Sequence, residues 1–354
     1  MSNVFVIAEA GVNHNGEKDK AFELVDIAAA AGADAVKFQT FNAERLVASS
    51  APKAAYQKER TDAQESQLAM LKRLELPLDW HLELQGYARQ KGVTFLSTAF
   101  DLGSLEFLET LNLPCYKIPS GEITNGPLLW AFANTGKPLI LSTGMATLGE
   151  VEQALAVVLH GRTHSAAPAS MEEVWRGWHI ARIPELRDAV TLLHCTSQYP
   201  TPLAEVNLRA MDTLGQAFDL PVGYSDHTEG TVVSVAAVAR GAKVIEKHFT
   251  ISRALPGPDH KASLEPHELA SMMKDIRAVE QMLGAPWKSP QISEWDTRGV
   301  GRQVLIATRN VTRGERFSVE NMASARAGKG RSAMEFWDAL NELSNRDLKP
   351  GEAL

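Results

Sequence analysis

Pro221-Val-Gly-Tyr-Ser-Asp-His227 and Ala242-Lys-Val-Ile-Glu-Lys-His-Phe-Thr250 are two short runs of β-type residues, each carrying a histidine near its end. The stretch between them, Thr231–Arg240, is apolar, and Gly241 follows it as a helix stop. Strand, helix and strand of this length predict a βαβ unit with two parallel strands. Because parallel neighbours end side by side, His227 and His248 are expected at one edge of a sheet.

Six further β-type runs precede this unit and alternate with helical stretches. They are Val4–Ala10, Ala33–Thr40, Val93–Phe100, Cys115–Ser120, Leu139–Gly144 and Ala189–Ser197. Continuous apolar strands that alternate with helices predict a parallel sheet covered on its faces. Eight such units in about 250 residues favour a closed (β/α)₈ TIM barrel. An open doubly wound sheet is the alternative, weakened because no Gly-x-Gly-x-x-Gly turn follows the first strand.

Two connections are longer than a barrel needs. Phe41–Asp79 contains a polar, helical arm at Tyr56–Leu74 that is expected to fold over the barrel mouth. His160–Asp188 is an insertion, and its Trp175 and Trp178 are expected to serve packing.

The chain divides near Pro286. We expect a barrel domain over residues 1–285, a linker over 286–296 and a small domain over 297–354. The small domain carries a weak repeat, since Thr308–Glu315 resembles Ser344–Glu352, and each copy predicts a short strand followed by a glycine turn. So small a domain is marginal alone and is expected to dock on a barrel, its own or a partner's.

Composition narrows the classes of function. The chain is 44% hydrophobic and 22% charged, with a net charge of −7, which argues against nucleic-acid binding and against a basic membrane-binding face. Neither a signal peptide nor a long apolar span is recognisable, so a cytoplasmic location is expected. Cys115 and Cys195 lie in apolar runs and are expected to be reduced.

The paired histidines suit a divalent metal with open coordination positions. Asp226 and Glu246 stand beside them and are expected to orient the rings. Two unrelated rim histidines remain the alternative.

Two lysines sit inside apolar strands, where an unpaired charge is costly. Lys37 and Lys117, with several hydroxyl groups and Gly144, fit a phosphate at the barrel mouth. A snorkelling or salt-bridged lysine is the alternative for each. A phosphate cradle beside a metal site would suit a condensation: the metal polarises a carbonyl, and the lysines hold a phosphorylated enol near it. Glu9 and Glu122 are the candidate acid, base or hydroxyl-binding groups, and the sequence leaves open which moves protons.

Six segments together resemble the N-acetylneuraminate (sialic acid) synthase family, in its sialic and legionaminic acid branch. They are Glu9–Gly16, Lys37–Gln39, Lys117–Glu122, Leu193–Ser197, Gly223–Thr228 and Glu246–Thr250, with Gly257–Leu264 similar to that branch. The C-terminal part resembles the family's antifreeze-like (SAF, β-clip) domain. The resemblance implies a domain-swapped homodimer that condenses phosphoenolpyruvate with an N-acylated amino sugar.

The resemblance also implies roles for individual residues. The catalytic set would be Glu9, Lys37, Lys117 and Glu122. The phosphoenolpyruvate set would be Lys37, Thr98, Lys117, Ser142, Ser197 and Ser225. The sugar set would be Gln39, Phe100, Glu122, Tyr199, Asp259 and, as the nearest match to a partner-domain arginine, Arg302. His227 and His248 would hold the metal, with Mn²⁺ expected first and Mg²⁺ or Co²⁺ as alternatives.

Three functions are weighed. The first is condensation of phosphoenolpyruvate, N-acetylmannosamine and water to N-acetylneuraminate and phosphate. The second is a legionaminic acid synthase acting on 2,4-diacetamido-2,4,6-trideoxymannose. A non-catalytic binding protein that uses the small domain comes third, and the complete set of polar strand ends argues against it.

Overall fold

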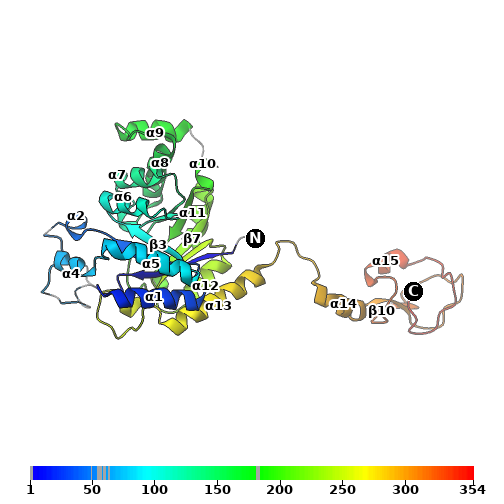
Figure 1. Ribbon diagram of the computed structural model, residues 1–354. Coiled ribbons are helices and arrows are strands. Elements are labelled where there is room, and N and C mark those ends of the chain that lie inside the picture. The colour runs from blue at the N-terminus through cyan, green and yellow to red at the C-terminus, as the bar shows by residue number, and fades with distance from the viewer. Residues whose placement is uncertain (1–2, 49, 54–57, 59–60, 63, 181–183) are drawn as a thin grey trace. The chain divides into compact units, whose positions relative to one another are not determined.

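The computed structural model describes residues 3–48, 50–53, 58, 61–62, 64–180 and 184–354. The chain forms two compact units, residues 1–284 and residues 285–354 (Figure 1). The first unit contains all eight strands of a parallel sheet. The second contains a small antiparallel sheet.

The eight strands lie in the order β3-β2-β1-β8-β7-β6-β5-β4, and every neighbouring pair is parallel. The two end strands, β3 and β4, also contact each other, which closes the sheet into a barrel. The predicted TIM barrel is therefore confirmed. The strands are β1 Phe5–Gly11, β2 Ala35–Thr40, β3 Thr94–Ala99, β4 Tyr116–Ile118, β5 Leu139–Ser142, β6 Val190–His194, β7 Val222–Asp226 and β8 Val244–His248.

Helices surround the strands, as Figure 1 shows for α1, α5, α12 and α13. The helices of the first unit are α1 Lys18–Ala31, α2 Ala43–Leu46, α4 Gln67–Leu74, α5 Leu78–Lys91, α6 Leu102–Thr110, α7 Gly126–Asn134, α8 Leu148–Thr163, α9 Met171–Ile180, α10 Pro184–Arg187, α11 Arg209–Phe218, α12 Val232–Ala239 and α13 Pro266–Leu283. Many begin at a capping side chain; Thr147 and Glu150, for example, form a capping box at the start of α8. Their apolar faces and the outward-facing strand residues form one large core.

Successive side chains of a strand point to opposite faces, so every second residue points into the barrel. A separate apolar layer fills the lower interior, formed by Ile7, Ala35, Leu96, Ile140, Leu193 and Val244. Two residues further along the same strands come polar side chains, among them Glu9, Lys37, Thr98, Ser142 and Glu246. The period of two thus produces an apolar layer inside the barrel, with a polar layer above it at the carboxyl ends of the strands.

The two long connections differ in what they contribute. The predicted arm at Tyr56–Leu74 is described only in part: residues 56–57, 59–60 and 63 lie outside the described residues, and α4 is its defined helix. In the insertion, α9 packs on α8. Trp175 and Trp178 pack against the main core, as predicted, and Trp178 Nε1 donates to Glu152 Oε1 at 3.0 Å.

The second unit contains α14 Trp295–Gly301, β9 Val304–Ala307, β10 Met322–Ala325 and α15 Phe336–Ala339, with β9 and β10 antiparallel. Its core is formed by Leu305, Ala307, Val311, Phe317, Met322, Ala339 and Leu348. The two copies of the sequence repeat pair with each other, because Val311 and Leu348 exchange backbone hydrogen bonds of 2.9 and 2.8 Å. Each copy forms an isolated bridge and not the full strand predicted. The assignment of 286–296 as a linker and 297–354 as an antifreeze-like domain stays a prediction.

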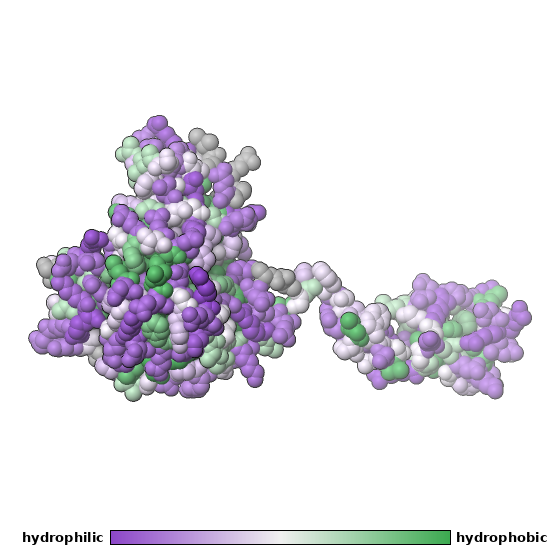
Figure 2. Space-filling model, viewed as in Figure 1, coloured by the Kyte–Doolittle hydropathy of each residue, from purple (hydrophilic) through white to green (hydrophobic). Residues whose placement is uncertain are grey.

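The outer surface of the barrel unit is mainly hydrophilic on the face seen in Figure 2. None of the helices in the described part of the chain has the length and apolar character needed to cross a bilayer.

A substitution at Gly223 would test how tightly the barrel interior is packed. A Cβ at this position would lie 2.3 Å from the Val244 carbonyl oxygen and 2.6 Å from Leu193 Cδ2, and the backbone oxygen cannot turn away. We expect Gly223→Ala to lower the free energy of unfolding by about 1–3 kcal/mol, measured by urea denaturation. Gly86→Ala in α5 is the control, since a Cβ there meets nothing within 4 Å. It should raise stability by about 0.5–1 kcal/mol. Equal effects of the two substitutions would contradict the packing argument.

Candidate functional site

A cavity of about 500 Å³ opens at the carboxyl ends of the strands. Every predicted site residue except Arg302 lines it: Glu9, Lys37, Gln39, Thr98, Phe100, Lys117, Glu122, Ser142, Ser197, Tyr199, Ser225, His227, His248 and Asp259. Arg302 directly follows α14 in the second unit and is exposed. The sequence therefore located the cavity, whereas the roles assigned to its residues stay predictions.

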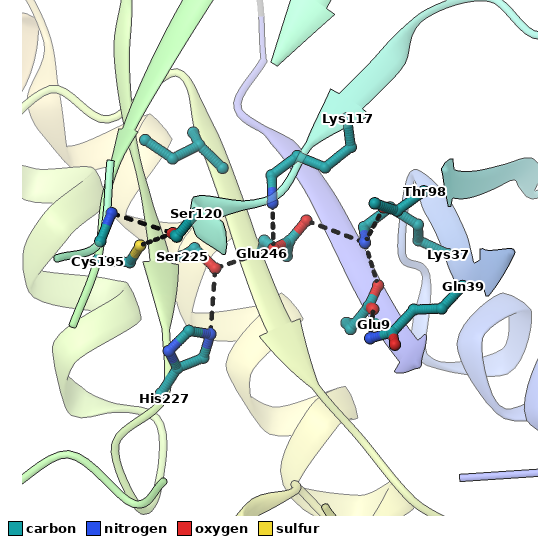
Figure 3. Close-up of polar contacts among 12 residues, drawn as sticks. Glu9, Lys37, Gln39, Thr98, Lys117, Ser120, Cys195, Ser225, His227 and Glu246 are labelled. Carbon is teal, nitrogen blue, oxygen red and sulfur yellow. Dashed lines mark hydrogen bonds and ion pairs between the residues drawn. The ribbon is translucent and has the colours of Figure 1, made fainter. Parts of the chain in front are cut away.

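Glu246 is the centre of the buried charges (Figure 3). Its Oε1 atom receives Lys117 Nζ at 2.9 Å and Ser225 Oγ at 2.9 Å, and its Oε2 atom lies 3.6 Å from Lys37 Nζ. Lys37 also pairs with Glu9 at 2.7 Å and donates to Thr98 Oγ1 at 2.8 Å. The lysines thus point into the barrel and hold carboxylates, so the salt-bridged alternative describes their state in this structure.

The two carboxyl groups of this network differ in protonation. Burial raises the pKa of Glu9 to about 7, against the opposing charge of Lys37. Burial also disfavours the charged form of Glu246, but Lys117 and Lys37 outweigh it and hold the pKa of that carboxyl well below its usual range. Lys37 keeps its proton, because Glu246 and Glu9 overcome the effect of burial on its pKa. Glu246 is therefore a fixed anion, and Glu9 can exchange a proton near neutral pH.

His227 and His248 face each other at the cavity, with ring centroids 5.7 Å apart. His227 Nδ1 lies 2.6 Å from the Thr196 carbonyl oxygen, which can only accept, so the ring proton sits on Nδ1. The unprotonated Nε2 of His227 accepts from the Tyr199 hydroxyl at 3.0 Å. His248 Nδ1 is buried and has no hydrogen-bond partner among the described residues; Asp259 Oδ2 is 4.0 Å away.

Both imidazoles are neutral, since burial lowers the pKa of His227 to about 4 and that of His248 well below its usual value. Both rings line the same cavity, and neutral imidazole nitrogens are ligands that suit a divalent cation. Within the described part of the chain, the side chains form no group of three or more metal-ligating residues. Two histidines would leave several coordination positions to water and substrate, which suits a catalytic site better than a structural one.

The predicted orienting carboxylates were assigned wrongly. Asp226 precedes His227 by one residue, so its side chain points to the opposite face of β7, where it pairs with Lys247 at 3.1 Å. Glu246 points inward like His248 but binds the lysines instead. The Thr196 carbonyl orients His227, and a backbone acceptor leaves no signal in the sequence.

A second group of hydroxyls surrounds Gly144. Its N–H donates to Ser120 Oγ at 3.0 Å, and a Cβ on Gly144 would lie 2.5 Å from Ser197 Oγ and 2.8 Å from Ser120 Oγ. Ser142 Oγ is buried and has no partner within the described residues. A glycine and converging hydroxyls leave donors for an anion next to Lys117.

The remaining predicted residues line the upper cavity. Gln39 donates to Glu9 Oε1 at 3.2 Å, and the half-buried Glu122 accepts from Asn125 at 2.7 Å. Ser120 was assigned no role in the predicted site, and Glu246 was expected only to orient a histidine. Ser120 lies within the Lys117–Glu122 segment, and Glu246 shares the inward face of β8 with His248, so strand parity alone would have added Glu246.

Asp226 and Lys247 form a second, fully buried pair between the sheet and α12. They are directly paired in the β7–β8 register, and both side chains are 0% exposed. Asp226 also accepts from Thr228 and Ser234, and Lys247 donates to the Thr228 carbonyl. The pair therefore holds together the two strand ends that carry the histidines.

Comparison with known proteins supports one family. The model of the NeuB family matches residues 24–288. N,N'-diacetyllegionaminic acid synthase of Campylobacter jejuni is 45% identical over 100% of this chain and 99% of its own length. The synthase of the same name from Legionella pneumophila is 43% identical over 99% of this chain and 93% of its own. Among solved structures, N-acetylneuraminic acid synthetase of Leptospira borgpetersenii, in complex with citrate, is 33% identical with a TM-score of 0.68, covering 84% of this chain and 90% of that one.

The Asp226–Lys247 pair gives a direct test of the strand-end geometry. Asp226→Asn leaves a buried ammonium group without its counter-ion, and we expect it to lower the free energy of unfolding by about 3–5 kcal/mol. Asp226→Asn/Lys247→Met removes both charges and should recover most of that loss, because methionine has a similar length. Urea denaturation of the two variants measures both effects. A double variant less stable than Asp226→Asn would contradict the pairing.

Proposed function

Because the chain belongs to the NeuB family, it is a phosphoenolpyruvate-condensing synthase, and we propose that it forms a diacetylated acid of the legionaminic type. The proposed sugar substrate is 2,4-diacetamido-2,4,6-trideoxymannose. Both full-length relatives described above carry the name of this activity, which supports the legionaminic alternative better than the N-acetylmannosamine reading favoured by the sequence. Formation of N-acetylneuraminate is kept as the second candidate, on the likeness to the Leptospira enzyme.

The observation that supports the proposal is the charge at the bottom of the cavity. We call Glu9, Lys37, Lys117 and Glu246, which pair with one another there, the cavity floor. Lys37 and Lys117 both pair with the anion Glu246, and burial raises the pKa of Glu9 to about 7, so that Glu9 can exchange a proton near neutral pH. The floor carries one net positive charge when Glu9 is protonated and none when Glu9 is charged, and a divalent cation adds two positive charges in either case. Phosphoenolpyruvate carries about −1.5 to −2 on its phosphate and one more negative charge on its carboxylate. The lysines and the cation together therefore offset most of its charge in either state of Glu9.

We assign the two lysines and the hydroxyls of Thr98, Ser142, Ser197 and Ser225 to phosphoenolpyruvate. All of these side chains line the same cavity, next to the glycine at position 144. Held there, the enol ester would present its CH₂ carbon toward the two histidines. Gln39, Phe100, Glu122, Tyr199 and Asp259 would contact the sugar.

The reaction forms one carbon–carbon bond and releases one phosphate. The CH₂ carbon of phosphoenolpyruvate attacks the sugar aldehyde, water adds to the neighbouring carbon, and phosphate leaves to give a 2-keto acid. NeuB-family enzymes use a divalent metal, and His227 and His248 would hold it. When bound, such an ion supplies Lewis-acid polarisation of the aldehyde oxygen. Glu9 would accept the proton of the attacking water, because its pKa near 7 allows that exchange.

Three further expectations rest on the resemblance. The metal is proposed to be Mn²⁺, with Mg²⁺ or Co²⁺ as alternatives. The active form is proposed to be a domain-swapped homodimer, and Arg302 would then reach the sugar in the partner's cavity.

Phosphate release tests the proposal. We expect release only when phosphoenolpyruvate and the diacetamido sugar are both present, and we expect EDTA to stop it and added Mn²⁺ to restore it. His248→Ala should lower kcat/KM by at least about 100-fold, because it removes one of two metal ligands. His164→Ala is the matched control, since His164 directly follows α8, is exposed and is absent from the cavity lining. Activity that survives both EDTA and His248→Ala would refute the metal-dependent mechanism.

Gly144 offers an independent test of the phosphoenolpyruvate assignment. In Gly144→Ala the new Cβ would lie within 3 Å of Ser197 Oγ, Ser120 Oγ and Cys195 Sγ, which are side-chain ends and not backbone, so the fold should persist, as a thermal midpoint checks. We expect KM for phosphoenolpyruvate to rise about tenfold or more while KM for the sugar changes little. Gly149→Ala, in the first turn of α8, meets nothing within 4 Å and should leave both values unchanged. A rise confined to the sugar KM would reverse the assignment.

A further inference from the structure

One wall of the cavity is apolar. Of the residues that form it, Val12, Phe41 and Phe100 directly follow the first three strands. Leu46 ends α2, Val47 follows it, and Met70, Leu71 and Leu74 belong to α4. All of them except Val47 form a hydrophobic cluster separate from the barrel core. Phe41 and Phe100 meet edge to face, with ring centroids 6.0 Å apart. We call these eight residues the apolar wall.

The apolar wall has a buried back and an open front. Val12, Phe41, Met70 and Leu74 are at most 6% exposed, so they support the structure. Leu46, Val47, Leu71 and Phe100 are only half-buried and line the cavity. Apolar surface at the front of a concave site gains free energy when a ligand covers it.

The wall carries no positive charge. Among the lining residues that the structure describes, the only lysines or arginines are Lys37 and Lys117, and both are paired with Glu246 on the floor. The other lining carboxyl groups, those of Glu9, Glu122 and Asp259, are acidic. A phosphate or carboxylate placed against the wall would therefore be desolvated without a counter-ion.

We propose that the apolar wall selects the sugar, by taking its uncharged, methyl-bearing end. This inference rests on the proposed function and deepens it. The diacetamido-trideoxy sugar carries three methyl groups, at C6 and on two acetyl groups. N-acetylmannosamine carries one methyl group and has hydroxyls at C4 and C6, and its 6-phosphate adds a charge.

Covering methyl groups with apolar surface discriminates between such sugars. Each methyl or methylene group in an apolar pocket contributes about 10-fold or more to specificity. A hydroxyl placed there is rejected about as strongly, and a phosphate more strongly. We expect kcat/KM to fall in the order diacetamido sugar, N-acetylmannosamine, N-acetylmannosamine 6-phosphate.

Leu71 and Leu68 provide a matched pair of variants on α4. Both are leucines, both are half-buried, and they stand three residues apart. Leu71 lines the cavity and belongs to the cluster, whereas Leu68 does neither. Leu71→Gln puts a polar group at the front of the wall, and Leu68→Gln makes the same chemical change outside it.

The experiment measures kcat/KM for the three sugars at saturating phosphoenolpyruvate and Mn²⁺, on the full chain. Leu71→Gln should reduce the preference for the diacetamido sugar over N-acetylmannosamine about tenfold, with KM for phosphoenolpyruvate unchanged. Leu68→Gln should keep the wild-type preference, and Leu71→Met, which conserves apolar surface, should keep it within about threefold. Thermal midpoints of all variants check that the fold persists.

The outcomes separate the two claims. One outcome is that the wild-type chain condenses phosphoenolpyruvate with a sugar while Leu71→Gln and Leu68→Gln show the same preference for the diacetamido sugar over N-acetylmannosamine. In that case the apolar wall does not select the sugar, and the proposed function stands. Equal kcat/KM of the wild-type chain for N-acetylmannosamine and its 6-phosphate would also contradict the proposal that the apolar wall selects the sugar. If none of the three sugars supports phosphate release, the proposed function itself fails.

Discussion

The carboxylate of Glu246 between Lys37 and Lys117 is the interaction on which the site depends. Its three partners come from β2, β4 and β7, so one side chain on β8 ties together strands from around the barrel. Both lysine side chains are at most 5% exposed, and Glu246 is the counter-ion that they share. The network keeps two cations ready for an anionic ligand and leaves Glu9, which shares only Lys37, as the carboxyl that can change its protonation.

Sequence reasoning succeeded wherever the period of the strands carried the information. Eight β-type runs separated by helical stretches predict the barrel, because parallel strands need helical crossovers. A lysine inside such a run, as at Lys37 or Lys117, can only point to the barrel interior or to the helix layer. Polar residues at the strand ends therefore located the cavity, whereas Arg302 belongs to the second unit and its assignment to the sugar stays a prediction.

The errors have an equally simple cause. Asp226 and Glu246 were judged by their nearness to a histidine in the sequence, which takes no account of the opposite side-chain direction of Asp226 or of the lysines that compete for Glu246. Asp226 thus faces Lys247 across the neighbouring strand, and Glu246 serves the lysines. The Thr196 carbonyl that orients His227, and the bridge between Val311 and Leu348, are backbone contacts formed by the fold. No residue type in the sequence indicates such backbone contacts.

The connection after β2 shows why a pattern judged polar can still carry recognition. In α4, Met70, Leu71 and Leu74 share one face, and that face meets the cavity and the ends of the first strands. An apolar stripe of one helical turn is too short to anchor a core helix, and here its outer edge remains open to a ligand. The two halves of the cavity consequently differ in origin. The ionic floor stands on barrel strands whose geometry the closed sheet fixes, whereas the apolar wall stands on a connection that can vary without disturbing the sheet. A barrel built this way can keep one phosphorylated substrate while the second substrate changes, because each is recognised by a different part of the chain.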